Sequence, residues 1–359
     1  MCGETLTSRE RVLRAFYRVP ADRVPIDYLA NPGIDGRLKA HFGLEAADGE
    51  GLKAALHVDF RGVGPAYIGP KLYEDLPGGV VVDNWGIHRR WVEHGSGGYW
   101  DYCDFPLREA DEETVNAWKM PNPDDFDYSV VAEQCRRHDA FALTVHCYGD
   151  LINGNGMLRG MEQTLIDLLT DEPAGLLLAD RRFAVQQEIA RRTLEAAKGR
   201  VDILWLGEDL GTQDRPMISM DLFRRHIRPR FEGLVALARA YGCHPMIHTC
   251  GSSSWAYEDF IDMGIEAVDT LQPECKNMSP RYLADTFGGR LSFHGCISTA
   301  GAVTSGTTDD VRREVRDTLD IMLPTCSYML SPTHELQDNS PTENVLAMYD
   351  EAMKYGFYR

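Results

Sequence analysis

The feature that most constrains the fold of this chain is a regular alternation of short apolar segments with amphipathic ones. Most of the apolar runs are followed by a polar or glycine-bearing end and then by a helical pattern. Continuously apolar runs of this length are typical of strands that are buried on both faces of a parallel sheet. The candidate strands are residues 24–28, 58–64, 141–147, 201–207, 244–248, 266–271, 291–296 and 327–332.

Helical patterns lie between these strands. In one of them Ser219 is a suitable N-cap and Gly242 a suitable stop. Strands that alternate with helices predict a parallel sheet covered by helices. Eight such strands in 359 residues predict a closed TIM-type (β/α)8 barrel in a single domain, residues 1–359, with an N-terminal helical segment. A doubly wound open sheet is the alternative, but no G-x-G-x-x-G follows the first strand.

Residues 70–128 interrupt the alternation after the second strand. Their strand-like pieces are short and separated by glycines, and aromatic residues are dense among them. This pattern predicts a β-hairpin excursion inserted between two barrel strands. Two interpretations stay open: a small satellite core, or a lid whose aromatic side chains form one wall of a pocket.

Composition excludes several classes of partner. The formal net charge is −18 and the pI about 5.0, which disfavours binding to nucleic acid or to anionic lipid. No apolar run approaches the ~18 residues that a spanning helix needs, and the first residues lack the core of a signal peptide. Nine scattered cysteines are typical of a reducing compartment. We therefore expect a cytoplasmic protein that binds neither nucleic acid nor membranes.

The stretch MIHTCGSSS places His248 and Cys250 two residues apart at the end of the fifth strand. The active site of a parallel barrel lies at the carboxyl ends of its strands. Side chains at i and i+2 point the same way, roughly 6.5–7 Å apart along the backbone. A zinc ion could bridge that separation. Two ordinary buried residues would give the same pattern, so the hypothesis depends on a third ligand.

Several residues compete for the place of third ligand in a catalytic zinc site, which also keeps one position open. Cys326 begins the last strand and should lie at the wrong end of the barrel, while Cys275 lies on a loop. His294 and Cys296 form a second H-x-C, but with the first pair they would make a closed, structural site. His334 follows the last strand at its mouth end and is the preferred third ligand.

The chain resembles the uroporphyrinogen decarboxylase superfamily, and specifically its cobamide-dependent methyltransferase branch. The resemblance spans the whole chain and implies a single (β/α)8 barrel. The stretches that carry it are SRERVLRAF, VDFRGVGPAYIG, DNWGIHRRWVEHGSGGYWDYCDFPL, GEDLGTQ, IHTCGS, LSFHGCIST and SPTHELQDNSPTENVLAMY.

Two comparisons with the superfamily bear on the site. The decarboxylases carry an arginine pair after the first strand, where this chain has only a displaced Arg37, so a porphyrinogen decarboxylase is not expected. The methyltransferase branch binds zinc through an H-x-C motif and a later cysteine. His248 and Cys250 match the motif, but His334 stands at the cysteine's place. Gln272 is nearest to a fourth, weaker ligand position.

The resemblance implies a zinc-dependent methyltransferase. Its corrinoid (cobalamin) would come from a separate protein, since this chain has no D-x-H-x-x-G motif. The favoured reaction is O-demethylation of a methoxylated aromatic, with zinc stabilising the leaving oxygen. Glu208 is the expected general acid. The expected substrate contacts are Trp85, Tyr99, Trp100 and Tyr148.

Three alternatives stay open. The first is methylcobalamin:thiol methyl transfer, in which zinc would activate a substrate thiol. The second is a metal-independent decarboxylase, a lyase for a small carboxylate, and the third is a barrel that binds a ligand without catalysis. The sequence leaves open whether the chain forms a homodimer.

Overall fold

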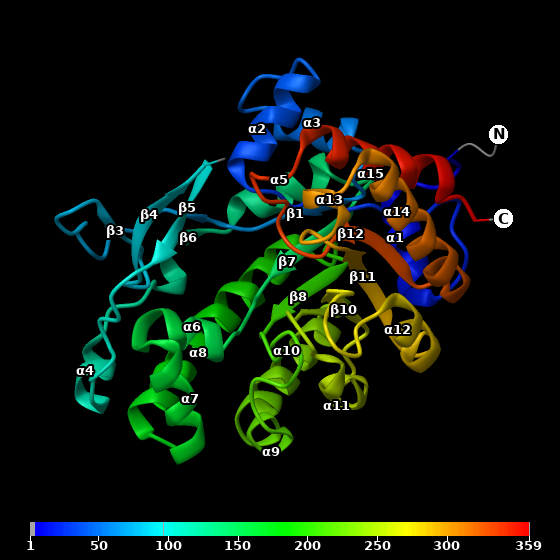
Figure 1. Ribbon diagram of the computed structural model, residues 1–359. Coiled ribbons are helices and arrows are strands. Elements are labelled where there is room, and N and C mark those ends of the chain that lie inside the picture. The colour runs from blue at the N-terminus through cyan, green and yellow to red at the C-terminus, as the bar shows by residue number, and fades with distance from the viewer. Residues whose placement is uncertain (1–3, 96, 359) are drawn as a thin grey trace.

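The computed structural model describes residues 4–95 and 97–358 and contains a curled parallel sheet at its centre (Figure 1). Its strand order is β1-β7-β8-β9-β10-β11-β12, and every neighbouring pair is parallel. An order that never reverses is that of a TIM-type barrel, which confirms the predicted fold class over the doubly wound alternative. The strands are β1 Phe60–Gly62, β7 Ala142–His146, β8 Ile203–Gly207, β9 His244–His248, β10 Ala267–Thr270, β11 Ser292–Ile297 and β12 Tyr328–Pro332.

The predicted first strand, residues 24–28, is reduced to a single parallel bridge between Ile26 and Leu330 of β12. On its other side, the carbonyl oxygen of Ile26 accepts the backbone N–H of Asp59, just before β1, at 2.8 Å. The segment therefore lies between the first and last strands of the sheet and closes the barrel. Pro25 has no N–H to donate, which limits how far the ladder can extend.

Helices connect the strands and cover the outer face of the sheet (Figure 1). Ser219 caps the predicted helix, since its side chain accepts the N–H of Leu222, and the helix continues as α9, a π-helical turn and α10. None of the helices in the described part of the chain is long and apolar enough to cross a bilayer. The helices are α1 Ser8–Tyr17, α2 Pro32–His41, α3 Gly49–Ala55, α4 Glu112–Ala117, α5 Ser129–Arg137, α6 Ile152–Arg159, α7 Met161–Thr170, α8 Pro173–Ala197, α9 Met220–Leu222, the π-helix Phe223–Ile227, α10 Arg228–Ala240, α11 Tyr257–Met263, α12 Pro280–Phe287, α13 Ala302–Ser305, α14 Thr308–Met322 and α15 Thr342–Tyr355.

The excursion after the second predicted strand is confirmed. It leaves the barrel through an antiparallel pair, β2 Ala66–Tyr67 with β6 Phe126–Asp127, and carries a three-stranded antiparallel sheet (Figure 1). A satellite core of its own lies beneath, built from Ile87, Leu107 and Val115 with Leu158 and Leu178 of the barrel's helices. The three strands are β3 Val80–Val82, β4 His88–His94 and β5 Gly97–Tyr102.

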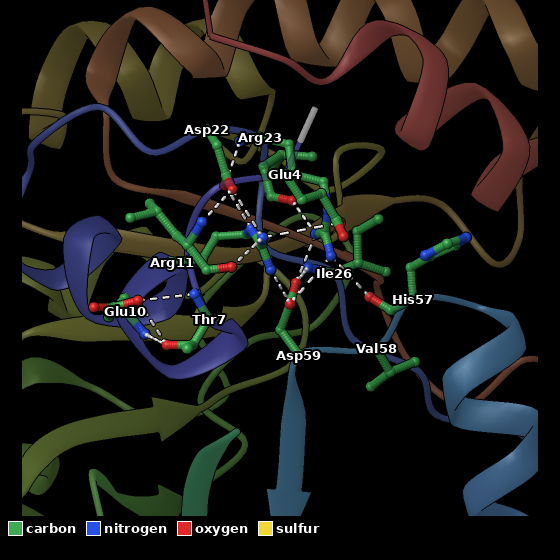
Figure 2. A network of polar contacts seen from close by, with 12 residues as sticks. Glu4, Thr7, Glu10, Arg11, Asp22, Arg23, Ile26, His57, Val58 and Asp59 are labelled. Atoms are coloured by element: carbon green, nitrogen blue, oxygen red, sulfur yellow. Dashed lines mark hydrogen bonds and ion pairs between the residues drawn. The ribbon is translucent and has the colours of Figure 1, made fainter. Parts of the chain in front are cut away.

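A buried cluster of ion pairs joins the N-terminal segment to the amino-terminal end of the barrel (Figure 2). Asp59 is fully buried and accepts hydrogen bonds from Arg11 at 2.6 Å and from Arg23 at 2.7 Å. Asp22 binds the other side of the Arg11 guanidinium at 2.7 Å. Each charge has an opposite partner at hydrogen-bond distance, which is the condition for tolerating charges in a protein interior.

Candidate active site

A cavity of about 510 Å³ opens at the carboxyl ends of the barrel strands. Four aromatic side chains stand in its walls: Tyr28, Phe60, Tyr148 and Trp205. Six carboxylates also line it, and among the described lining residues they face a single lysine, Lys53. The carboxylates are Asp27, Asp150, Glu208, Asp209, Asp269 and Glu335. The aromatic walls suit an aromatic molecule, and Lys53 is the one lysine or arginine among the described lining residues.

The structure brings His248, Cys250 and His334 together, and the two histidines line this cavity. One ligand atom from each lies within 4.8 Å of the other two. The Sγ of Cys250 is 3.4 Å from Nε2 of His248, close to the separation of about 3.6 Å that tetrahedral zinc imposes on a nitrogen and a sulfur ligand. The donor set, two imidazoles and a thiol, therefore fits zinc and leaves one coordination position for another molecule.

The turn after β9 is shaped to present the Cys250 thiol. The backbone N–H of Cys250 donates to Oδ1 of Asp209 at 2.9 Å. The next N–H, that of Gly251, donates to Oε1 of Gln272 at 2.6 Å. Gly251 has φ +72°, and a side chain there would overlap the carbonyl oxygen of Gly211. Gln272 thus holds the turn through its amide oxygen, and its predicted role as a fourth ligand or substrate contact remains a prediction.

His248 is oriented by a carboxylate behind it. Its Nδ1 is 2.7 Å from Oδ2 of Asp269 and 2.9 Å from the hydroxyl of Thr270, so Nε2 is the nitrogen that faces Cys250. Burial alone would lower the pKa of His248, but Asp269 and the Cys250 sulfur raise it well above its ordinary value. A carboxylate behind a histidine ligand is a common arrangement in zinc sites.

Glu208 lies at the inner wall of the cavity, where β8 ends. Both of its carboxylate oxygens accept backbone N–H groups at the start of α6, from Leu151 at 2.7 Å and Ile152 at 3.1 Å. Burial, followed by the neighbouring Asp150 carboxylate, raises the pKa of Glu208 well above its ordinary value despite those two hydrogen bonds. A carboxyl group held in this way suits general acid chemistry near neutral pH.

The predicted substrate contacts fall in different places. Tyr148 lines the cavity, half exposed, and its ring passes over Gly207, where a side chain would collide with it. Trp85 packs instead against the satellite core, while Tyr99 and Trp100 are each 45% exposed on the hairpin β4–β5. These three are not among the described residues that line the cavity. Substrate contact for them remains a prediction, one that the cavity's walls do not support.

Two carboxylates of the site, Asp27 and Asp269, are absent from the sequence prediction. Asp27 is the one charged residue in the apolar run VPIDY. In EAVDTL, Asp269 is the one charged residue after the glutamate that begins the run. A charge inside a strand that should be buried on both faces needs a buried partner, so it marks a functional or structural site. That signal was present in the sequence, although it does not name the partner.

Comparisons with known proteins agree with this architecture. The model of the family described as uroporphyrinogen decarboxylase (URO-D) matches residues 181–355, the part of the chain that contains His248, Cys250 and His334. Residues 181–355 are therefore similar to the uroporphyrinogen decarboxylase family. The match confirms the predicted resemblance over these residues, and one solved structure shares the fold over nearly the whole chain. A methyltransferase from Methanosarcina mazei superposes with a TM-score of 0.68 at 16% identity, covering 98% of this chain and 99% of that one. A search of curated proteins gives no match.

Proposed function

We propose that this uroporphyrinogen decarboxylase-like protein is a zinc-dependent methyltransferase that moves a methyl group between a small substrate and a corrinoid carried by a separate protein. The observation that carries the proposal is the convergence of His248, Cys250 and His334, of which the two histidines line the cavity. Three donors with an open fourth position are the arrangement of catalytic zinc sites. The methyltransferase fold of the Methanosarcina mazei protein supports it.

The favoured substrate is a methoxylated aromatic, from which the methyl group passes to the corrinoid. When bound, zinc would supply Lewis-acid stabilisation for the oxygen that leaves. The chain's own residues have other tasks. The rings of Tyr28, Phe60 and Tyr148 offer faces and edges to an aromatic substrate. Glu208 lies in the same cavity and would donate the proton that the leaving oxygen takes up.

The charge of the cavity weighs against the decarboxylase alternative. A decarboxylase must bind an anionic carboxylate, and a superfamily member of that kind would need cationic side chains to hold it. Here no arginine is among the described residues that line the cavity, and Lys53 is the one lysine. The same charge pattern weighs against carboxylated methyl ethers.

A matched pair of ligands tests this specificity. We expect methoxybenzene to bind the zinc-loaded protein roughly tenfold or more tightly than 4-methoxybenzoate, because like charges at a binding site are repulsive. Isothermal titration calorimetry of both ligands measures the ratio. Equal affinity for the two would contradict the charge argument while leaving the metal site untouched.

The substitution Glu208→Gln tests the general acid. We expect the rate constant of methyl transfer to fall by about 10²-fold or more, with zinc content and substrate affinity unchanged. Because the pKa of Glu208 is raised, the wild-type rate should decline as the pH rises through that pKa and the acid loses its proton. The variant should lack this decline, and a variant with the wild-type rate and pH profile would show that Glu208 is structural.

The proposal as a whole is tested by metal content and by turnover. We expect about one zinc per chain by elemental analysis of the protein as purified. With a Co(I) corrinoid protein, the zinc-loaded enzyme should convert methoxybenzene to phenol and methyl-cobalt, which is followed by absorbance. Transfer to a thiol instead would select the thiol alternative. A metal-free protein of full activity would overturn the proposal.

A further inference from the structure

Four side chains from different parts of the barrel form one hydrogen-bonded row in the wall of the cavity. Nε2 of His294 is 3.1 Å from Oδ2 of Asp27, and Nδ1 of His294 is 2.6 Å from Oδ1 of Asp269. The second oxygen of Asp269 is 2.7 Å from Nδ1 of His248. The row therefore runs Asp27–His294–Asp269–His248, and its last member faces Cys250.

Both ends of His294 are occupied, and its faces are packed. The residue is 3% exposed. The rings of Phe60 and Trp205 meet it edge-on, with centroid distances of 5.5 and 5.1 Å. Since each ring nitrogen bonds to a carboxylate, rotation of the imidazole would break two hydrogen bonds inside the barrel. His294 is consequently a rigid part of the site, although it is not one of the three candidate ligands.

Asp269 has one oxygen for each histidine. Without His294, the oxygen Oδ1 would lie buried without its histidine partner, and the carboxylate could rotate away from His248. His248 Nδ1 could then bond to Thr270 alone, which lies 2.9 Å away. The direction of Nε2 toward Cys250 thus depends on a carboxylate whose own orientation depends on His294.

We propose that His294 is a positioning residue for the metal centre: it holds Asp269, which holds His248 with Nε2 directed at the metal. Asp27 holds the far side of His294, and all four members of the row line the cavity, so the cavity wall and the metal ligand share one network. This inference rests on the proposed role of His248, Cys250 and His334 as zinc ligands. Outer partners of this kind tune the affinity of the metal as well as its orientation.

A second histidine–carboxylate pair in the barrel, His244 with Glu266, serves as a control. At the opposite end of the same strand as His248, Nδ1 of His244 is 2.7 Å from Oε2 of Glu266, just before β10. This pair matches the His248–Asp269 pair in chemistry, in distance and in the elements that carry it. It lies away from the cavity, since neither His244 nor Glu266 is among the described residues that line it.

The experiment measures the zinc dissociation constant of the full-length protein by competition with a chromophoric chelator. We expect Asp269→Asn to weaken zinc binding by about 10- to 100-fold. His294→Gln should weaken it by roughly tenfold, although it touches no ligand. Glu266→Gln should leave the constant unchanged. Thermal unfolding of each variant shows whether the barrel is intact.

A second variant protects the test if His294→Gln does not fold. Asp27→Asn alters the outer end of the row at a partly exposed site and should weaken zinc binding by several fold, less than Asp269→Asn. Wild-type protein that binds no zinc would overturn the proposed function and this inference with it. Tight zinc binding by the wild type, with an unchanged constant in folded His294→Gln or Asp27→Asn, would overturn the inference alone.

Discussion

Alanine in place of Cys250 is expected to remove zinc from the protein and to slow methyl transfer severely. The thiolate is the one sulfur donor in the candidate site, and its loss leaves two imidazoles, one of them on the exposed His334. Metal content should fall from about one zinc per chain to near zero. Since Lewis-acid stabilisation contributes several kcal/mol at the leaving oxygen, the rate should fall by roughly 10²- to 10³-fold or more.

A second cysteine serves as control for this result. Cys326 precedes β12, at the end of the barrel opposite the cavity, and Cys326→Ala should keep both zinc and activity. Elemental analysis and a single-turnover assay of the two variants provide the comparison. Zinc retained in full by Cys250→Ala would show that the triad is not the metal site, and zinc lost in Cys326→Ala would point to a different site.

The largest effect on stability is expected from Asp59→Ala. This carboxylate is fully buried between the guanidinium groups of Arg11 and Arg23, themselves each 2% exposed (Figure 2). It also accepts the backbone N–H of Ile26, in the segment that closes the barrel. Removing one partner from a buried ion-pair cluster leaves uncompensated charge, so we expect a loss of about 3–5 kcal/mol in the free energy of unfolding. Urea denaturation followed by circular dichroism measures it.

An exposed ion pair gives the matched comparison. Glu258 pairs with Arg290 on the surface, and Glu258→Ala should change stability little, because exposed pairs are screened by solvent. Equal losses for the two variants would mean that the buried cluster does not hold the barrel together.

The pH dependence of stability follows from the same cluster. Burial by itself would raise the pKa of Asp22, but hydrogen bonds from Arg11 and from the backbone of Leu6 lower it far below its ordinary value of 3.8. A depressed pKa in the folded state contributes stability above pH 3.8 that is lost as the pH falls below it. Arg11→Met should reduce this acid sensitivity.

Much of the fold was predictable because its signal is local. Seven of the eight predicted strands appear, since continuous apolar runs between helical patterns report burial on both faces. The remaining predicted strand, residues 24–28, forms a single bridge at Ile26. Its pairing depends on partners about 30 and 300 residues away, Asp59 and Leu330, and no local pattern specifies how many of its hydrogen bonds form.

The site was predictable in part for the same reason. His248 and Cys250 face one way because they alternate at a strand end, and the structure also brings His334 to them, as its place after the last strand predicts. The predicted substrate contacts in the excursion rest on less specific sequence evidence. A high density of aromatic residues in a sequence does not specify where a hairpin packs relative to the cavity. Here Tyr99 and Trp100 lie on an exposed sheet and are not among the described residues that line the cavity.

By itself, the sequence determined the barrel and the H-x-C pair, because strand burial and side-chain alternation are properties of a few consecutive residues. Only the tertiary structure decided what stands behind that pair. Asp27, Asp269 and His294 lie on segments far apart in the chain, and they meet because the barrel places those segments side by side around one interior. The partner of a buried charge is set by which strands become neighbours, and that is a property of the closed sheet.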